Sequence, residues 1–83
     1  MKMVKFQPIM DGVKRKAAIK EKVNGWNHSE YSDIHYFRRG KIGYIINAIT
    51  DEVEFRKFDY SESRYLDVTY EEFHKFIDIK VEN

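Results

Sequence analysis

The sequence contains no cysteine, and its uninterrupted apolar runs are short. Without cysteine the fold cannot depend on disulfides, and thiol nucleophiles and cysteine-based zinc sites are excluded. A run such as Tyr44–Ile46 is far shorter than the roughly 20 apolar residues that cross a bilayer. The first eight residues lack the apolar core of a signal peptide. These features predict a cytoplasmic protein that does not enter a membrane.

Leucine and proline are scarce as well: Leu66 and Pro8 stand alone, against nine isoleucines and six valines. Because β-branched residues favour strands, this bias predicts a core built mainly of sheet. A chain of 83 residues has room for one hydrophobic core, so we expect residues 1–83 to form a single small domain. A hydrophobic content of 42% with a net charge of only +1 excludes the composition of a disordered chain.

Charge is distributed unevenly along the chain. Residues 1–41 hold ten Lys and Arg but four Asp and Glu, whereas residues 42–83 hold five and ten. Such asymmetry indicates either a partner of opposite sign or packing of one half on the other. The sequence is also rich in residues with A/T-rich codons, which hints at an A/T-rich bacterial or phage genome. A phage or other mobile-element origin is therefore an expectation that rests on size and codon composition.

Alternation of apolar and polar residues predicts most of the strands. The expected strands are Met3–Ile9, Ile34–Arg39, Ile42–Ile49, Val53–Tyr60 and Tyr65–Val68. The second and third should form a hairpin around Arg39–Lys41. In the fourth, the apolar residues change parity near Arg56–Lys57, which predicts a β-bulge. The polar segment Asn27–Asp33 is expected to be a loop.

The segment Val13–Val23 fits two structures. Several of its residues are good helix formers, but on a helix its basic side chains would spread around the axis. As a strand it separates better, with Ala17 and Ile19 on an apolar face and four lysines on the other face. We therefore prefer the strand and keep the helix as the alternative. The lysines in question are Lys14, Lys16, Lys20 and Lys22.

The most specific local signal lies near the C-terminus. Thr69 and Glu72 fit a capping box, in which the threonine hydroxyl accepts from the Glu72 N–H and the carboxylate reaches back to the Thr69 N–H. Phe73, Phe76 and Ile77 then follow at helical spacing and would form an apolar stripe. The sequence predicts a helix over residues 70–77. The expected fold class is α+β, a twisted antiparallel sheet of about five strands with one C-terminal helix packed on it.

No catalytic, metal or cofactor site has a convincing signature. A polar stretch with His28, Ser29 and Ser32 contains hydrolase residue types, but no nucleophile elbow or oxyanion-hole motif accompanies them. The three histidines lack the spacing of a metal site. We therefore expect a protein that is not an enzyme, with no catalytic residues, no metal ligands, no cofactor and no small-molecule substrate.

Basic and aromatic residues supply the candidate binding set. The four lysines of Val13–Val23 would form a charged stripe on a strand, and three cations cluster at the expected hairpin tip, where they could meet phosphates. Trp26 is a candidate aromatic anchor for stacking. The full set is Lys14, Lys16, Lys20, Lys22, Trp26, Arg38, Arg39 and Lys41.

A domain this small has little volume for an active-site cavity, whereas an aromatic content of 16% suits a protein interface. The sequence therefore predicts a small non-catalytic binding or regulatory protein that acts through a protein partner or through self-association. The alternative is a nucleic-acid-binding module that uses the basic N-terminal half. Its isoelectric point near 7.9 is below the value above 9 that is typical of nucleic-acid-binding domains.

Overall fold

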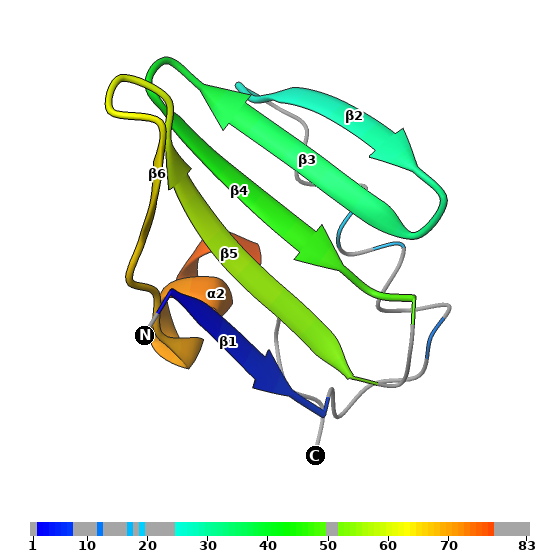
Figure 1. Cartoon of the computed structure of the whole chain (residues 1–83). Helices are drawn as coiled ribbons and strands as arrows, with labels where there is room; N and C mark the ends of the chain where they lie inside the picture. Colours follow the sequence, from blue (N-terminus) through cyan, green and yellow to red (C-terminus); the bar gives the residue numbers. More distant parts are fainter. Residues whose placement is uncertain are drawn as a thin grey trace.

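The computed structural model of the chain describes residues 2–7, 12, 17, 19, 25–49 and 52–77. Within them lie six strands and the helix α2, and the described residues Gly12, Ala17 and Ile19 are helical as well (Figure 1). The elements are β1 (Met3–Phe6), β2 (Asn27–Tyr31), β3 (Ile34–Arg39), β4 (Ile42–Asn47), β5 (Val53–Asp59), β6 (Arg64–Leu66) and α2 (Tyr70–Ile77). This arrangement confirms the expected α+β class, with six strands where about five were expected.

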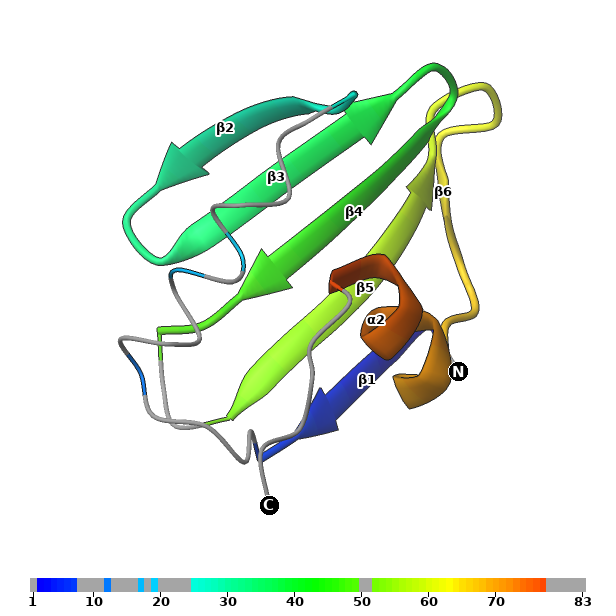
Figure 2. The ribbon, with the colours of Figure 1, turned by 180° about the vertical axis from the view of Figure 1, so that it is seen from behind.

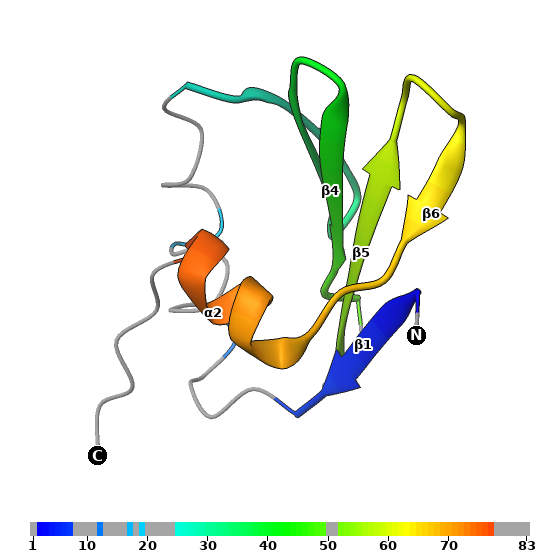
Figure 3. The same ribbon diagram turned by 90° about the vertical axis from the view of Figure 1, so that its left-hand side faces the viewer.

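The strands form one antiparallel sheet in the order β1-β5-β4-β3-β2. On the side of β5 away from β4, β1 pairs with residues 53–56 and β6 pairs with residues 57–59. Figure 2 shows α2 lying across one face of this sheet, and Figure 3 shows the twist of the strands and the helix beside them. The opposite face, which Figure 1 presents to the viewer, carries no helix among the described residues.

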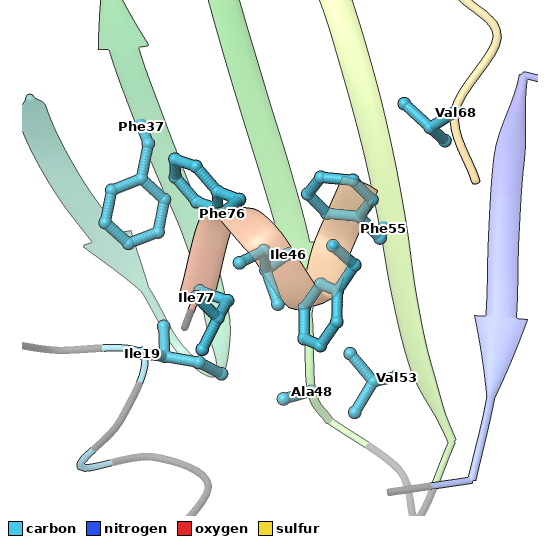
Figure 4. Packing of buried hydrophobic residues seen from close by; sticks show 10 residues of the cluster. Ile19, Phe37, Ile46, Ala48, Val53, Phe55, Val68, Phe76 and Ile77 are labelled. Atoms are coloured by element: carbon cyan, nitrogen blue, oxygen red, sulfur yellow. The ribbon is translucent and has the colours of Figure 1, made fainter. Parts of the chain in front are cut away.

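The hydrophobic core lies between α2 and the sheet (Figure 4). Its buried residues are Ile19, Phe37, Ile46, Ala48, Val53, Phe55, Val68, Phe73, Phe76 and Ile77. Aromatic rings make much of the contact, because Phe76 packs edge-on against Phe37 at 5.4 Å and Phe73 against Phe55 at 5.1 Å between centroids. Such pairs add to the free energy of burial when they meet edge to face. The apolar stripe expected on the helix is thus confirmed.

The helix begins as its sequence predicts, but only half of the capping box forms. The Thr69 hydroxyl accepts from the Glu72 N–H at 3.2 Å. The Glu72 carboxylate does not reach back to Thr69; it accepts a hydrogen bond from the Tyr44 hydroxyl at 2.6 Å and pairs with Lys57 at 3.2 Å. Tertiary partners on the sheet therefore replace the local one, because they offer a charge as well as a hydroxyl donor.

The loop predicted for Asn27–Asp33 is wrong, since most of this segment is strand β2. It pairs in continuous antiparallel register with β3, from Asn27 opposite Arg38 to Tyr31 opposite Ile34. A tight turn at Ser32, whose φ is 58°, joins the two strands. The segment is polar because β2 lies at the end of the strand order and most of its side chains are exposed. Tertiary pairing overrides the low intrinsic strand preference of these residues.

The β-bulge predicted in β5 is also wrong. Pairing with β4 runs without interruption from Asn47 opposite Glu54 to Ile42 opposite Asp59. The parity change has another cause: Val53 and Phe55 are buried on the helix side, whereas Phe58 belongs to the opposite face and joins other aromatic rings there. Apolar residues of both parities therefore reflect two apolar clusters and not an extra residue.

The strand expected over Val13–Val23 is wrong at the two of its residues that the structure describes, because both Ala17 and Ile19 are helical. Their burial agrees with this, since Ala17 is exposed while Ile19 is fully buried. Residues two apart share a face in a strand but lie about 200° apart on a helix. The four candidate lysines of this segment, Lys14, Lys16, Lys20 and Lys22, lie outside the described residues.

Candidate interaction surface on the open face of the sheet

The sheet face opposite α2 is termed the outer face. Residues directly opposite each other on neighbouring antiparallel strands point to the same face, so the register defines it row by row. The outer face consists of the rows Ser29, Tyr36, Ile45, Arg56, Met3; Tyr31, Ile34, Asn47, Glu54, Lys5; and Asn27, Arg38, Gly43, Phe58, Tyr65. The charged members of these rows are Lys5, Arg38, Glu54 and Arg56.

Three tyrosines of the outer face are open to solvent. The exposed fraction is 78% for Tyr31, 38% for Tyr36 and 37% for Tyr65. Scattered single apolar residues are normal on a protein surface, but a contiguous patch indicates an interaction site. Tyrosine is also among the residue types most enriched at interface hot spots.

A shallow hollow of about 190 Å³ lies in the middle of the outer face. Its lining consists of Ile34, Tyr36, Ile45, Asn47, Glu54, Arg56 and Tyr65. The guanidinium of Arg56 and the carboxylate of Glu54 form an ion pair at 3.5 Å. The hollow therefore combines apolar walls with a small number of polar groups, which is the composition of a recognition site.

A ladder of aromatic rings, termed the aromatic ladder, runs along one side of the outer face and ends in an arginine on each side. Its members in order are Arg38, Tyr60, Phe58, Tyr65 and Arg56. The Arg38 guanidinium lies 3.9 Å from the centroid of the Tyr60 ring, within cation–π range. The rings of Tyr60 and Phe58 and those of Phe58 and Tyr65 meet edge to face at 4.9 and 5.1 Å. These contacts fix the side chains before any partner arrives.

Gly43 makes the ladder possible. A Cβ atom at this position would lie 2.6 Å from Cε2 of Tyr60, closer than real Cβ contacts allow. The absence of a side chain therefore lets the Tyr60 ring lie over the backbone of β4. Gly43 serves close approach, which is one of the positional roles of glycine in strands.

The residues predicted from sequence are placed as follows. Arg38, Arg39 and Lys41 are exposed and meet at the β3–β4 hairpin, where Gly40 adopts a φ of 62°. The Arg38 Nε donates to the Gly40 carbonyl at 3.1 Å. The expected basic cluster at the hairpin tip is thus present, and Arg38 also belongs to the outer face.

Trp26 is placed differently from the expected exposed anchor. It is half-buried and packs against the core, with its ring centroid 5.5 Å from that of Tyr44 and 5.0 Å from that of Phe76. This position gives Trp26 a packing role at the edge of the core. Its role in binding stays a prediction.

The histidines form no metal site in the described part of the chain, where no group of three potential ligands comes together. His28 stacks on Phe37 with 4.6 Å between centroids, and its Nε2 lies 3.1 Å from Nδ1 of the buried His35. The third histidine, His74, lies 2.8 Å from the hydroxyl of Tyr70 one helical turn away. Packing and pairing account for the rings of His28 and His74.

The most perturbed titratable group, Tyr44, joins the helix to the sheet. Burial, the hydrogen bond to Glu72 and the negative charge of that carboxylate raise the pKa of Tyr44 far above its ordinary value near 10. Tyr44 is therefore a neutral donor at physiological pH. Its environment suits structural cross-linking between α2 and β4 and gives no activated base or nucleophile.

Most of the outer-face residues were not singled out from the sequence. The available signal was the parity change in β5, where Phe58 and Tyr60 depart from the helix-facing pattern of Val53 and Phe55. A parity change alone does not distinguish a bulge from a regular strand with apolar residues on both faces. No helix in the described residues is long and apolar enough to cross a membrane.

No protein-family model, curated protein or solved structure matches this chain.

Proposed function

We propose that this chain is a small non-catalytic binding protein that acts through a protein interface on the outer face of its sheet. The observation that carries the proposal is the combination of three exposed tyrosines, a hollow and the aromatic ladder on the sheet face that no described helix covers. Interface hot spots favour tyrosine and arginine, and groups already held in place lose little conformational entropy on binding.

The charges of this face favour protein over nucleic acid. A nucleic-acid platform offers unpaired cations to several phosphates. Here the Arg38 guanidinium lies over Tyr60 and Arg56 pairs with Glu54, so two of the three cations in these rows already have partners within the chain, and the third, Lys5, is exposed on β1. The Glu54 carboxylate in the hollow would repel a phosphate. Nucleic-acid binding remains the alternative, supported by the exposed basic cluster of Arg38, Arg39 and Lys41.

The experiment compares the tagged wild-type chain with two matched variants as bait in a lysate of the source organism. Tyr36→Ser removes an outer-face ring that is 38% exposed, and Tyr70→Ser removes a helix ring that is 36% exposed. We expect a protein captured by the wild type and by Tyr70→Ser, and reduced at least tenfold with Tyr36→Ser. Equal capture by all three baits would contradict the proposal.

The salt dependence of binding distinguishes the nucleic-acid alternative from protein binding. Binding of labelled DNA or RNA that falls steeply between 50 and 200 mM salt and is abolished by a combined Arg38→Glu, Arg39→Glu and Lys41→Glu variant would favour it. Absent or salt-insensitive binding would remove it.

A further inference from the structure

Tyr31 is the most exposed aromatic side chain among the described residues of the outer face. It lies at the end of β2 beside the Ser32 turn, with 78% of its surface in solvent. Tyr31 is opposite Ile34, which is opposite Asn47, which is opposite Glu54. The ring therefore stands in the same row as three residues that line the hollow, two strands away from its centre.

The hollow matches a tyrosine side chain in size and chemistry. An apolar cavity of about 150 Å³ holds one benzene molecule, and the hollow measures about 190 Å³. Ile34 and Ile45 give it apolar walls, and the Glu54 carboxylate, which pairs with Arg56 through Oε2, offers an acceptor for a phenol hydroxyl, whereas Asn47 Oδ1 already accepts from the Ile49 N–H. A buried tyrosine needs both, because its ring is apolar and its hydroxyl requires a hydrogen-bond partner.

Tyr31 cannot fill the hollow of its own chain. Neighbouring strands are about 4.8 Å apart, so β2 and β4 are separated by about 10 Å with β3 between them. One face thus carries both an exposed tyrosine, which we term the knob, and a hollow of matching chemistry. The two can meet only when two molecules associate.

We infer that the outer face binds a second copy of this chain, with Tyr31 of each copy inserted in the hollow of the other; the inference rests on the proposed function and names its partner. Consider a two-fold axis that runs parallel to β3 and directly above it, between the two facing sheets. Rotation about this axis places β2 of one copy over β4 of the other. Each Tyr31 then lies above the hollow of the other copy. Such an interface is isologous, so both knob-in-hole contacts form at once.

The residues on this axis suit a dimer centre. Ile34 and Tyr36 of β3 would meet their own counterparts, which gives the apolar middle that interfaces usually have. The ion pair of Arg56 and Glu54 lies beside this middle, in the lining of the hollow. Arg38, also on β3, lies over the Tyr60 ring and thus points toward β4, which limits like-charge contact at the axis.

The dimer should be weak. Two facing rows across five strands cover roughly 20 Å by 10 Å, or about 200 Å² per partner, which is well below the roughly 800 Å² per partner of a standard interface. We therefore expect a dissociation constant between about 10 μM and 1 mM. Sedimentation equilibrium between about 10 μM and 1 mM covers this range.

Two variants test the two halves of the contact, with a matched control. Tyr31→Ala removes the knob and Ile45→Trp fills the hollow, whereas Tyr70→Ala removes an aromatic ring from the helix on the other side of the molecule. Circular dichroism first confirms that each variant is folded. Tyr31→Ala and Ile45→Trp should each raise the dissociation constant of the dimer at least tenfold, and Tyr70→Ala should leave it unchanged. A wild-type chain that stays monomeric at 1 mM, or a dimer insensitive to Tyr31→Ala, overturns the inference.

A probe molecule distinguishes this failure from failure of the proposed function. p-Cresol, which carries the phenol group of tyrosine, is titrated into folded Tyr31→Ala and followed by amide chemical shifts. Shifts confined to the hollow residues and abolished by Ile45→Trp support recognition of a phenol by the hollow. The same shifts with a monomeric wild type overturn the second copy as occupant, while the bait experiment above still decides whether another protein uses the face.

Discussion

At the scale of single residues, glycine and tyrosine positions decide what the outer face can do. Gly43 and Tyr60 lie far apart in sequence, yet the Tyr60 ring packs closely on Gly43. Neither residue type predicts this contact by itself. Arg38 then lies over the same ring. A side chain at Gly43 would disturb all three groups, although the backbone of β4 would accept it without strain.

Gly43→Ala should destabilise the fold by about 1–3 kcal/mol, because the new Cβ would overlap the Tyr60 ring and push it off the sheet. Urea denaturation gives the free energy of unfolding. The same substitution in a Tyr60→Ala background is the control, since the ring that clashes is then absent. An equal loss in both backgrounds would mean that the overlap is not the cause.

At the scale of elements, one polar cluster holds α2 on the sheet. Tyr44 comes from β4, Lys57 from β5 and Glu72 from the helix, and the carboxylate accepts from the hydroxyl while it pairs with the ammonium group. Lys57 also lies 5.8 Å from the centroid of the Tyr44 ring. Three elements are thereby joined at a point where the core gives way to solvent.

This cluster predicts a loss of stability at alkaline pH. The pKa of Tyr44 is raised in the folded state above its unfolded value near 10, so its contribution is complete below pH 10 and is lost as pH rises toward the folded pKa. Between pH 9 and 11, the wild type should lose more stability than Tyr44→Phe, by at most about 1 kcal/mol per pH unit because the ring keeps some contact with water. Parallel curves for the two proteins would rule out this origin.

At the scale of the whole molecule, the sheet has apolar clusters on both faces, but only one is a core. Phe55 is fully buried among the rings of Tyr44, Phe73 and Phe76, whereas Phe58 is half-buried in the aromatic ladder. The two phenylalanines lie on one strand, three residues apart, and differ mainly in what covers them.

Phe55→Ala should therefore cost about 3–5 kcal/mol, which is a large part of the roughly 4–12 kcal/mol expected for a domain of this length. Phe58→Ala should cost clearly less, because solvent already reaches that face. Thermal and urea unfolding of both variants measures the difference. Similar losses for the two would show that the outer face is as much a core as the helix side.

Much of the fold followed from local sequence. The β3–β4 hairpin and the helix from Tyr70 to Ile77 were predicted because alternation, turn residues and a threonine cap are signals that a segment carries within itself. The polar strand β2 was missed, since its pairing with β3 is a tertiary contact that exposed residues do not reveal. The bulge predicted in β5 was wrong for a related reason, because the sequence does not show that Phe58 faces the side of the sheet opposite the core.

The sequence by itself determined the class of fold, the helix and its apolar stripe, and the basic hairpin tip, because each depends on neighbours within a few residues. Only the tertiary structure decided which side of the sheet α2 covers, where the Glu72 carboxylate finds its partners, and that Tyr31, Tyr36 and Tyr65 share one open face. The physical reason is that a pleated strand sends side chains to both faces, and long-range packing selects which face is buried.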